Sequence, residues 1–380
     1  MAAIVGWETL RDLARFRAEK GLALSFYLAL DPRVAPTAAD ADTRFNSVLH
    51  AGERRAAAGR RELTHEQREA LKADFERIRR WFDEEFDRDG AHGLAIFTAG
   101  LDNFWTALPL GNAAGDDVKL GNDFYVAPLV PLVGKGEGAI VAFVSRERGD
   151  LYRMRGARLQ EVADLSEEMP GRHDQGGWSQ ANYQRAIEKQ AAEHVRRVAD
   201  ELNRRVRRDN GVPVVVAATE EMRAEFEEAL AREARAALAG WASAEAHATP
   251  AELLAAALPI LDEWQARREH ELLERWREEA GRNGRAAAGW EDTLEAASDG
   301  RVELLIFQEG ADREAWQCPS CGRAATASGS CPLDGTRMEP REEGLDLAVH
   351  QTLAHGGTVW ALRFQRDLDP VEGIGALLRY

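Results

Sequence analysis

Apolar residues along the first third of the chain recur with both helical and strand spacing. At 65–86, Leu71, Phe75, Ile78 and Phe82 recur at intervals of three and four residues, which places them on one buried helix face. Further helices are predicted at 7–16 and 37–58, and strands at 22–30, 93–97, 104–110 and 124–130. These elements predict a small α/β domain without a visible catalytic motif.

The middle of the chain alternates between predicted strands and helices. Residues 139–144 and 150–154 form a hairpin that turns at 147–149. Later elements are a buried strand at 212–218 and helices at 183–208, 220–230 and 251–279. Such alternation implies a sheet that is covered by helices.

The last third starts with a helix and continues with strands at 302–307 and 358–364 and a helix at 346–353. A chain of 380 residues is too long for one core. We therefore predict an α/β fold with α+β elements and three domains, at 1–133, 134–284 and 285–380.

Composition and charge narrow the functional classes. The chain is 44% hydrophobic and 30% charged, as in an ordinary soluble protein, and no apolar run approaches the ~20 residues of a membrane helix. The start of the chain lacks the basic flank and apolar core of a signal peptide, so we expect a cytoplasmic protein with no membrane partner. The net charge of -16 argues against DNA and against indiscriminate nucleic-acid binding, because phosphate contacts need local positive charge.

All three cysteines fall in one short stretch, which favours a metal site over a disulfide framework. Cys318-Pro-Ser-Cys321-Gly and Cys331-Pro-Leu-Asp334-Gly repeat one pattern, Cys-Pro-x-[Cys/Asp]-Gly. Two such turns present four ligands tetrahedrally, and thiolates suit Zn²⁺. The pattern predicts a zinc-ribbon-like insertion at 316–338 with a structural role. Because the fourth ligand is an aspartate, a decayed ribbon held by packing stays open as the alternative to bound zinc.

A polar loop at 171–185 separates the predicted hairpin from the long helix. The pair Gly176-Gly177 permits backbone angles closed to other residues and close approach of another backbone. Gln180, three residues beyond the pair, is neutral and can hold a water or a carbonyl by hydrogen bonds. This combination suggests a loop that inserts a glutamine into a site made mostly by another molecule.

Positive charge gathers around this loop. The window 172–208 holds nine Arg and Lys against five Asp and Glu. Arg185, Lys189 and Arg196 share a helical face near the loop and suit phosphate contacts, and Arg172 is a weaker candidate. A solvated helix after a flexible glycine-rich loop explains the same residues, and short motifs often match by chance. The spacing alone leaves both explanations open.

Taken in order, these features resemble the archaeo-eukaryotic class-I release factor family, which includes Pelota and bacterial homologues. In that family a central domain carries a Gly-Gly-Gln loop, and a third α/β domain often holds a zinc-ribbon insertion. This chain has Gly-Gly-Trp-Ser-Gln at 176–180, the two cysteine turns at 318–335, and Gly-Ile-Gly-Ala-Leu-Leu-Arg-Tyr at 373–380. The ending is very like the Gly-Ile-Gly-x-Ile-Leu-Arg-Tyr segment of the family. The resemblance covers roughly the last two-thirds of the chain and implies a three-domain release-factor-like architecture.

The departures from the family pattern bear on function. Trp178 and Ser179 separate the glycine pair from Gln180, so the loop is closer to the Gly-x-x-Gln loop of the branch that resembles ribosome-quality-control peptidyl-tRNA hydrolases. The first domain also lacks an Asn-Ile-Lys-Ser-like codon-reading motif. The resemblance therefore implies codon-independent rescue, by hydrolysis of peptidyl-tRNA on stalled ribosomes or large subunits. The alternatives are a nuclease that cuts the tRNA acceptor end and a non-catalytic ribosome-binding hibernation or stress factor.

The resemblance also implies roles and partners. Gln180 would orient a water or steady the developing oxyanion, and Gly176 and Gly177 would permit the tight backbone path. Trp178 would anchor the loop or stack on a terminal base, and Ser179 would cap the following helix. The implied partners are the peptidyl transferase centre of the large ribosomal subunit and peptidyl-tRNA, with a translational GTPase as an optional further partner. No catalytic cofactor is expected.

Overall fold

Two compact units make up the chain, one formed by Met1–Gly134 with Ala266–Tyr380 and the other by Lys135–Gln265. The computed structural model describes residues 5–58, 63–88, 90–133, 138–155, 158–166, 178–209, 212–218, 220–245, 247–282 and 284–380, and only the backbone of 178–188 and 221. The fold is a mixed α/β, multidomain one, as predicted. The division at 133/134 and 284/285 stays a prediction.

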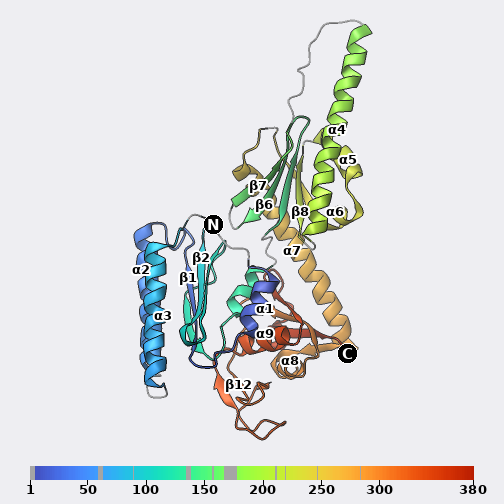
Figure 1. Cartoon of the computed structure of the whole chain (residues 1–380). Coiled ribbons are helices and arrows are strands. Elements are labelled where there is room, and N and C mark those ends of the chain that lie inside the picture. The colour runs from blue at the N-terminus through green and yellow to red at the C-terminus, as the bar shows by residue number, and fades with distance from the viewer. Residues whose placement is uncertain are drawn as a thin grey trace. The chain divides into compact units, whose positions relative to one another are not determined.

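The first unit contains an antiparallel sheet with the strand order β3-β2-β1-β4. Its strands are β1 (Ala23–Ala29), β2 (Gly93–Ala99), β3 (Phe104–Leu110) and β4 (Asp117–Gly121). Helices α2 (Ala38–Ala58) and α3 (His65–Glu84) cover one face (Figure 1). Alternate residues of β1, such as Leu24 and Phe26, pack against Phe45 of α2 and Phe75 of α3. The predicted inward face of α3 is confirmed, because all four of its apolar residues are buried.

Asp74 of α3 holds the turn that follows β2. The Thr98 hydroxyl donates to Asp74 Oδ1 at 2.7 Å, and the Gly100 N–H donates to Oδ2 at 3.1 Å. The residue is 4% exposed. Burial raises the pKa of this carboxyl, and the two hydrogen bonds oppose that shift only in part.

Replacing Asp74 by alanine is expected to lower the free energy of unfolding by about 1–3 kcal/mol, because two buried donors lose their acceptor. Since the folded-state pKa is raised, the stabilisation from Asp74 is largest below the unfolded-state pKa and declines as the pH rises through the folded-state pKa. Urea unfolding of both proteins at about pH 4 and about pH 7 measures this difference. Asp83→Ala, at an exposed position of the same helix, is the control. A smaller difference at the acidic pH would contradict the expectation.

The second sheet of this unit has the strand order β10-β16-β11-β15. Its strands are β10 (Ala286–Ala288), β11 (Val302–Gln308), β15 (Thr358–Leu362) and β16 (Ile374–Leu378). Only β11 and β15 run parallel. Helices α8 (Gly289–Ser298) and α9 (Gly344–Ala354) pack on this sheet, and their core continues into α1 (Trp7–Arg15) and the free face of the first sheet.

One predicted strand of the first third is wrong. The segment 124–130 is not a strand, and the 3₁₀ helix η3 (Ala127–Leu132) starts within it. Pro128 sits at the start of that helix, where its missing N–H costs nothing, and Pro131 also cannot donate to a sheet ladder. The fourth strand of the sheet is instead β4. Its strand pattern is weak in the sequence, because the charged residues Asp117 and Lys119 flank Val118, its one buried residue.

The second unit is a five-stranded sheet with the order β7-β6-β5-β8-β9. The predicted hairpin is confirmed as antiparallel β5 (Ile140–Val144) and β6 (Gly149–Arg155), and β8 (Val214–Ala218) and β9 (Leu238–Ser243) run parallel to β5. The sequence pattern missed β9 and the edge strand β7 (Arg158–Asp164). One face packs on α4 (Trp178–Arg208), α5 (Glu220–Ala229) and α6 (Arg232–Ala237), and the other packs on the first half of α7 (Pro250–Gly281).

The later part of α7 belongs to the first unit, where Leu273 and Trp276 pack with Ile306 and Leu377. Ile-Gly-Ala-Leu-Leu near the chain's end forms β16 (Ile374–Leu378), which lies between β10 and β11. None of the helices in the described ranges combines the length and the hydrophobicity needed to cross a membrane.

Candidate functional site

The predicted ribbon is a three-stranded sheet with two equivalent turns. Its strands are β12 (Ala315–Gln317), β13 (Ala324–Ala325) and β14 (Glu339–Arg341), in the order β13-β12-β14. In the first turn the Gly322 N–H donates to Cys318 O at 2.9 Å, and in the second the Gly335 N–H donates to Cys331 O at 2.9 Å. Both glycines have left-handed backbone, with φ of 80° and 74°. The repeated sequence pattern therefore encodes one repeated backbone turn.

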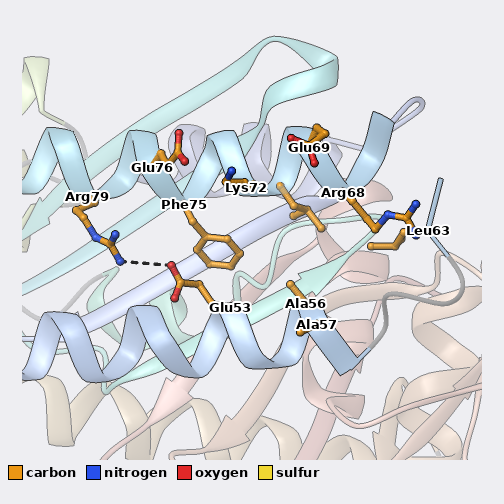
Figure 2. Close-up of a pocket in the computed structure, with 11 residues that line it drawn as sticks. Glu53, Ala56, Ala57, Leu63, Arg68, Glu69, Lys72, Phe75, Glu76 and Arg79 are labelled. Carbon is orange, nitrogen blue, oxygen red and sulfur yellow. Dashed lines mark hydrogen bonds and ion pairs between the residues drawn. The ribbon is translucent and has the colours of Figure 1, made fainter. Parts of the chain in front are cut away.

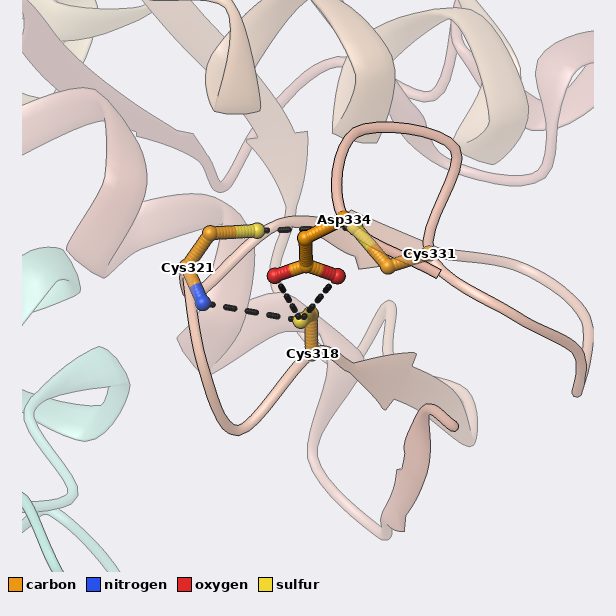
Figure 3. Close-up of side chains that lie close together, drawn as sticks. All are labelled: Cys318, Cys321, Cys331 and Asp334. Carbon is orange, nitrogen blue, oxygen red and sulfur yellow. Dashed lines mark hydrogen bonds between the residues drawn. The ribbon is translucent and has the colours of Figure 1, made fainter. Parts of the chain in front are cut away.

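These two turns bring together all four predicted metal ligands (Figure 3). The ligand atoms of Cys318, Cys321, Cys331 and Asp334 lie within 4.8 Å of one another. Cys321 Sγ is 3.5 Å from Cys331 Sγ, and Cys318 Sγ is 3.5 Å from Asp334 Oδ2. A tetrahedral Zn²⁺ site with Zn–S bonds of ~2.3 Å needs ligand-to-ligand distances of about 3.8 Å. The donor set and its spacing thus fit a zinc ion.

The electrostatics of the four ligands differ. The Thr336 N–H donates to Asp334 Oδ1 at 2.9 Å and holds the pKa of that carboxyl well below its usual range. Burial raises the pKa of the Cys318 thiol, but the N–H groups of Cys321 and Ser320 outweigh burial, and the net shift is downward. The fold therefore lowers the pKa of two of the four ligating groups from their ordinary values.

The predicted catalytic glutamine lies at the N-terminal end of α4. The helix begins at Trp178, five residues before the predicted start at 183, so the backbone of Trp178, Ser179 and Gln180 is helical. The first N–H groups of a helix have no partner within it and form its positive end. Gly176, Gly177 and Arg172 lie outside the described residues.

Helix α4 carries the predicted basic face. Lys189 and Arg196 are both exposed and lie seven residues, or about two turns, apart. Lys189 pairs with Glu193 at 3.7 Å. Arg185 belongs to the same helix, and only its backbone is described.

One further residue of this face was not among the predicted RNA-binding residues. Arg207 is exposed and follows Arg196 by eleven residues, which is about three turns. The spacing was readable from the sequence, since it repeats the interval between Arg185 and Arg196. Other arginines of α4 have structural contacts: Arg205 pairs with Glu201 at 2.8 Å and donates to Val162 O at 2.7 Å.

A cavity of about 380 Å³ lies between α2 and α3. Figure 2 shows Phe75 between the two helices and the ion pair of Glu53 with Arg79, which is 3.3 Å long. The side chains that line the cavity include both acidic and basic ones, and none of the predicted site residues is among them. It is therefore not part of the candidate functional site.

Similarity to known proteins is found by sequence and by structure. Residues 125–261 match the family described as bacterial archaeo-eukaryotic release factor family 10. Peptide chain release factor subunit 1 of Archaeoglobus fulgidus is 26% identical over 209 residues, which are 53% of this chain and 51% of that protein. The same factor of Thermococcus sibiricus is 24% identical over 210 residues, covering 52% and 51%. The chain thus spans about half the length of the curated relatives it matches.

Solved structures give only distant likenesses. A crystal structure of the archaeal translation termination factor aRF1 aligns over 99% of both chains, with 16% identity and a TM-score of 0.27. Pelota of Archaeoglobus fulgidus aligns over 76% of this chain and 79% of its own, with 14% identity and a TM-score of 0.34. At these TM-scores the assignment rests on the sequence matches instead.

The predicted resemblance is confirmed by the family match, which contains Gln180 and the whole of α4. The archaeal release factors add a second line of sequence similarity. Residues 125–261 thus form a region like that of the bacterial archaeo-eukaryotic release factor family 10, and about half of the chain is similar to archaeal peptide chain release factor subunit 1.

Proposed function

We propose that this protein is a codon-independent ribosome-rescue factor that hydrolyses the ester of peptidyl-tRNA on stalled ribosomes or large subunits. The observation that carries the proposal is the position of Gln180, in the first turn of α4 and inside the family match. The name of the archaeal relatives, peptide chain release factor subunit 1, agrees with release chemistry. Codon independence is supported by the two extra residues before Gln180 and by the missing codon-reading motif in 1–133.

The proposed mechanism assigns the chemistry to hydrogen bonds. The glutamine amide is a donor and an acceptor, so it can hold a water toward the ester carbon or donate to the oxyanion that forms. The N-terminal end of α4 adds positive potential where negative charge develops. The glycines at 176 and 177 let the backbone approach the substrate closely. The protein then acts by positioning and electrostatics in a site completed by the ribosome.

The proposed partners are the peptidyl transferase centre of the large subunit and peptidyl-tRNA in the cytoplasm, and a translational GTPase would be a delivery partner. Arg185, Lys189, Arg196 and Arg207 would face RNA phosphates, with Arg172 and Trp178 beside the inserted tip. We further propose that Cys318, Cys321, Cys331 and Asp334 hold one structural zinc ion. The zinc ion would cross-link the two turns. It would have no open coordination position for a reaction.

A release assay tests the proposed function. Purified protein is incubated with 70S ribosomes, and separately with 50S subunits, that carry labelled peptidyl-tRNA with and without a stop codon. Codon-independent release of free peptide, with an intact tRNA end, is the expected result. A shortened tRNA would instead identify an acceptor-end nuclease, and ribosome binding without either product would identify a hibernation or stress factor. Either of those results overturns the proposal.

Replacing Arg196 by alanine should weaken ribosome binding several-fold and lower the salt dependence of log K by about one unit, because one phosphate contact is lost. Arg196 is exposed and has no ion pair among the described residues, so the change leaves the helix core intact. Binding titrations at several salt concentrations measure both quantities. Arg54→Ala, at an exposed position of α2, is the matched control. If the two variants lose ribosome affinity equally, α4 is not part of the RNA-binding surface.

A further inference from the structure

Two buried polar residues on α9 connect distant parts of the first unit. Asp346 and His350 lie four residues, or about one helical turn, apart and are 5% and 2% exposed. Buried polar groups are costly unless they are hydrogen-bonded. Both residues direct their hydrogen bonds to backbone groups of the first third of the chain.

Asp346 holds the start of η3. The N–H groups of Val126 and Ala127 both donate to Asp346 Oδ1, at 2.8 and 2.9 Å. These are free donors at the N-terminal end of a short helix, which a side-chain oxygen ordinarily satisfies from the preceding residue. Here the oxygen comes from a helix more than two hundred residues later in the chain. The carboxylate therefore replaces a local helix cap with a long-range one.

His350 bridges two further segments. Its Nδ1 is 3.0 Å from Ala14 O, near the end of α1, and its Nε2 is 2.7 Å from Phe124 O. Both partners are carbonyl oxygens, which accept hydrogen bonds from an imidazole N–H. Asp346 Oδ2 lies 3.4 Å from Nε2. Ala14 O belongs to the last turn of α1, where helix carbonyls have no intrahelical partner.

The surroundings extend this contact. Arg341 donates to Asp123 Oδ1 at 2.7 Å, and Lys119 pairs with Glu343, so charged pairs join the same two parts of the chain. Phe124 stacks on Phe16 with ring centroids 4.5 Å apart. Figure 1 shows α1 beside α9. One hydrophobic core includes residues from both regions.

We infer that the first region of the chain is a fixed part of the C-terminal body, held there by Asp346 and His350 as positioning residues. This inference does not depend on the proposed function. The predicted first and third domains then move together, and the surface of 5–133 keeps one orientation relative to the ribbon. These contacts are incompatible with a first region that moves independently of the C-terminal body, as a separate codon-reading domain would.

The double variant Asp346→Ala/His350→Phe of the full chain tests this inference. Hydrogen–deuterium exchange measured by mass spectrometry should be at least roughly tenfold faster in 5–16 and 122–133 of the variant than of the wild type. The loss of buried hydrogen bonds lowers the free energy of local opening by an amount that corresponds to such a factor. The strands β11 and β16 should keep their protection. Thr352→Val is the control on the same helix, because this buried hydroxyl has no hydrogen-bond partner among the described residues.

Unchanged exchange in 5–16 and 122–133 would overturn the inference, and so would acceleration spread equally over β11 and β16. If the double variant does not fold, His350→Phe replaces it. Asp346 still accepts the Val126 and Ala127 N–H groups, but Ala14 O and Phe124 O lose their side-chain partner. Exchange should then accelerate in 5–16, and no acceleration there would overturn the role of His350. A failed release assay would leave both results unaffected.

Discussion

Cys318→Ser is expected to abolish stoichiometric zinc binding and to expose the ribbon to proteolysis. Cys318 is buried, and its Sγ approaches Asp334 and receives the Cys321 N–H at 3.5 Å. Substitutions outside the ligand shell already reduce metal affinity about 10- to 100-fold, so loss of a ligand should exceed a hundredfold or so. Zinc content after exhaustive dialysis and competition with a chromogenic chelator measure the change. Ser328→Ala, at an exposed ribbon position, is the control.

Wild-type protein that purifies without metal and gains none on titration with zinc would contradict this prediction. The ribbon would then be held by packing, for which a small buried cluster of Cys318, Cys331 and Met338 is available. A second test separates these cases, because a chelator should increase proteolysis of 318–341 only if zinc holds the turns together. Metal-dependent folding has this property, since the binding free energy is also folding free energy.

The ribbon could be predicted because its information is local. Each turn is specified by a cysteine, a ligand three residues later and a glycine that takes left-handed backbone, all within five residues. The inward face of α3 was predictable for the same reason, since helical periodicity repeats within one element. Patterns of this kind need no knowledge of what packs against them.

The missed or misplaced secondary-structure elements lie in segments that are short, of mixed polarity or determined by tertiary contacts. β9 is six residues long and contains an alanine, a glycine and a tryptophan in sequence, which is a weak strand signal. β7 lies at a sheet edge with most residues exposed or half-exposed, so alternation is faint. The start of α4 was placed too late because 178–182 is mostly polar.

The contacts of Asp346 and His350 were beyond prediction from one sequence. Their partners at Val126, Phe124 and Ala14 lie more than two hundred residues away, and no spacing rule links such positions. An aspartate and a histidine four residues apart on a helix are ordinarily surface residues. Burial and hydrogen-bond partners distinguish them, and both come from the fold.

Gln180→Ala should reduce the rate of peptide release about 10²- to 10³-fold, the usual cost of removing one donor that stabilises an oxyanion. Gln180 lies in the first turn of α4, and alanine has a high helix propensity, so α4 should remain folded. Ribosome affinity should change little, because the exposed cations farther along the helix are untouched. Single-turnover release at saturating protein, with affinity measured separately, distinguishes a chemical defect from a binding defect.

Gln190→Ala is the matched control for this experiment, since it removes the same amide from the same helix about three turns farther on. The Gln190→Ala variant should release peptide at a rate within about threefold of that of the wild type. Gln190 lies far from the loop tip, which is at the N-terminal end of α4. Equal rates for the wild type and Gln180→Ala would show that another group orients the water. The backbone N–H groups at the start of α4 would then be the remaining donors, because they are free of intrahelical partners and survive the substitution. The variant Ser179→Pro, which removes one of those N–H groups while fitting the first turn of a helix, would test that reassignment directly.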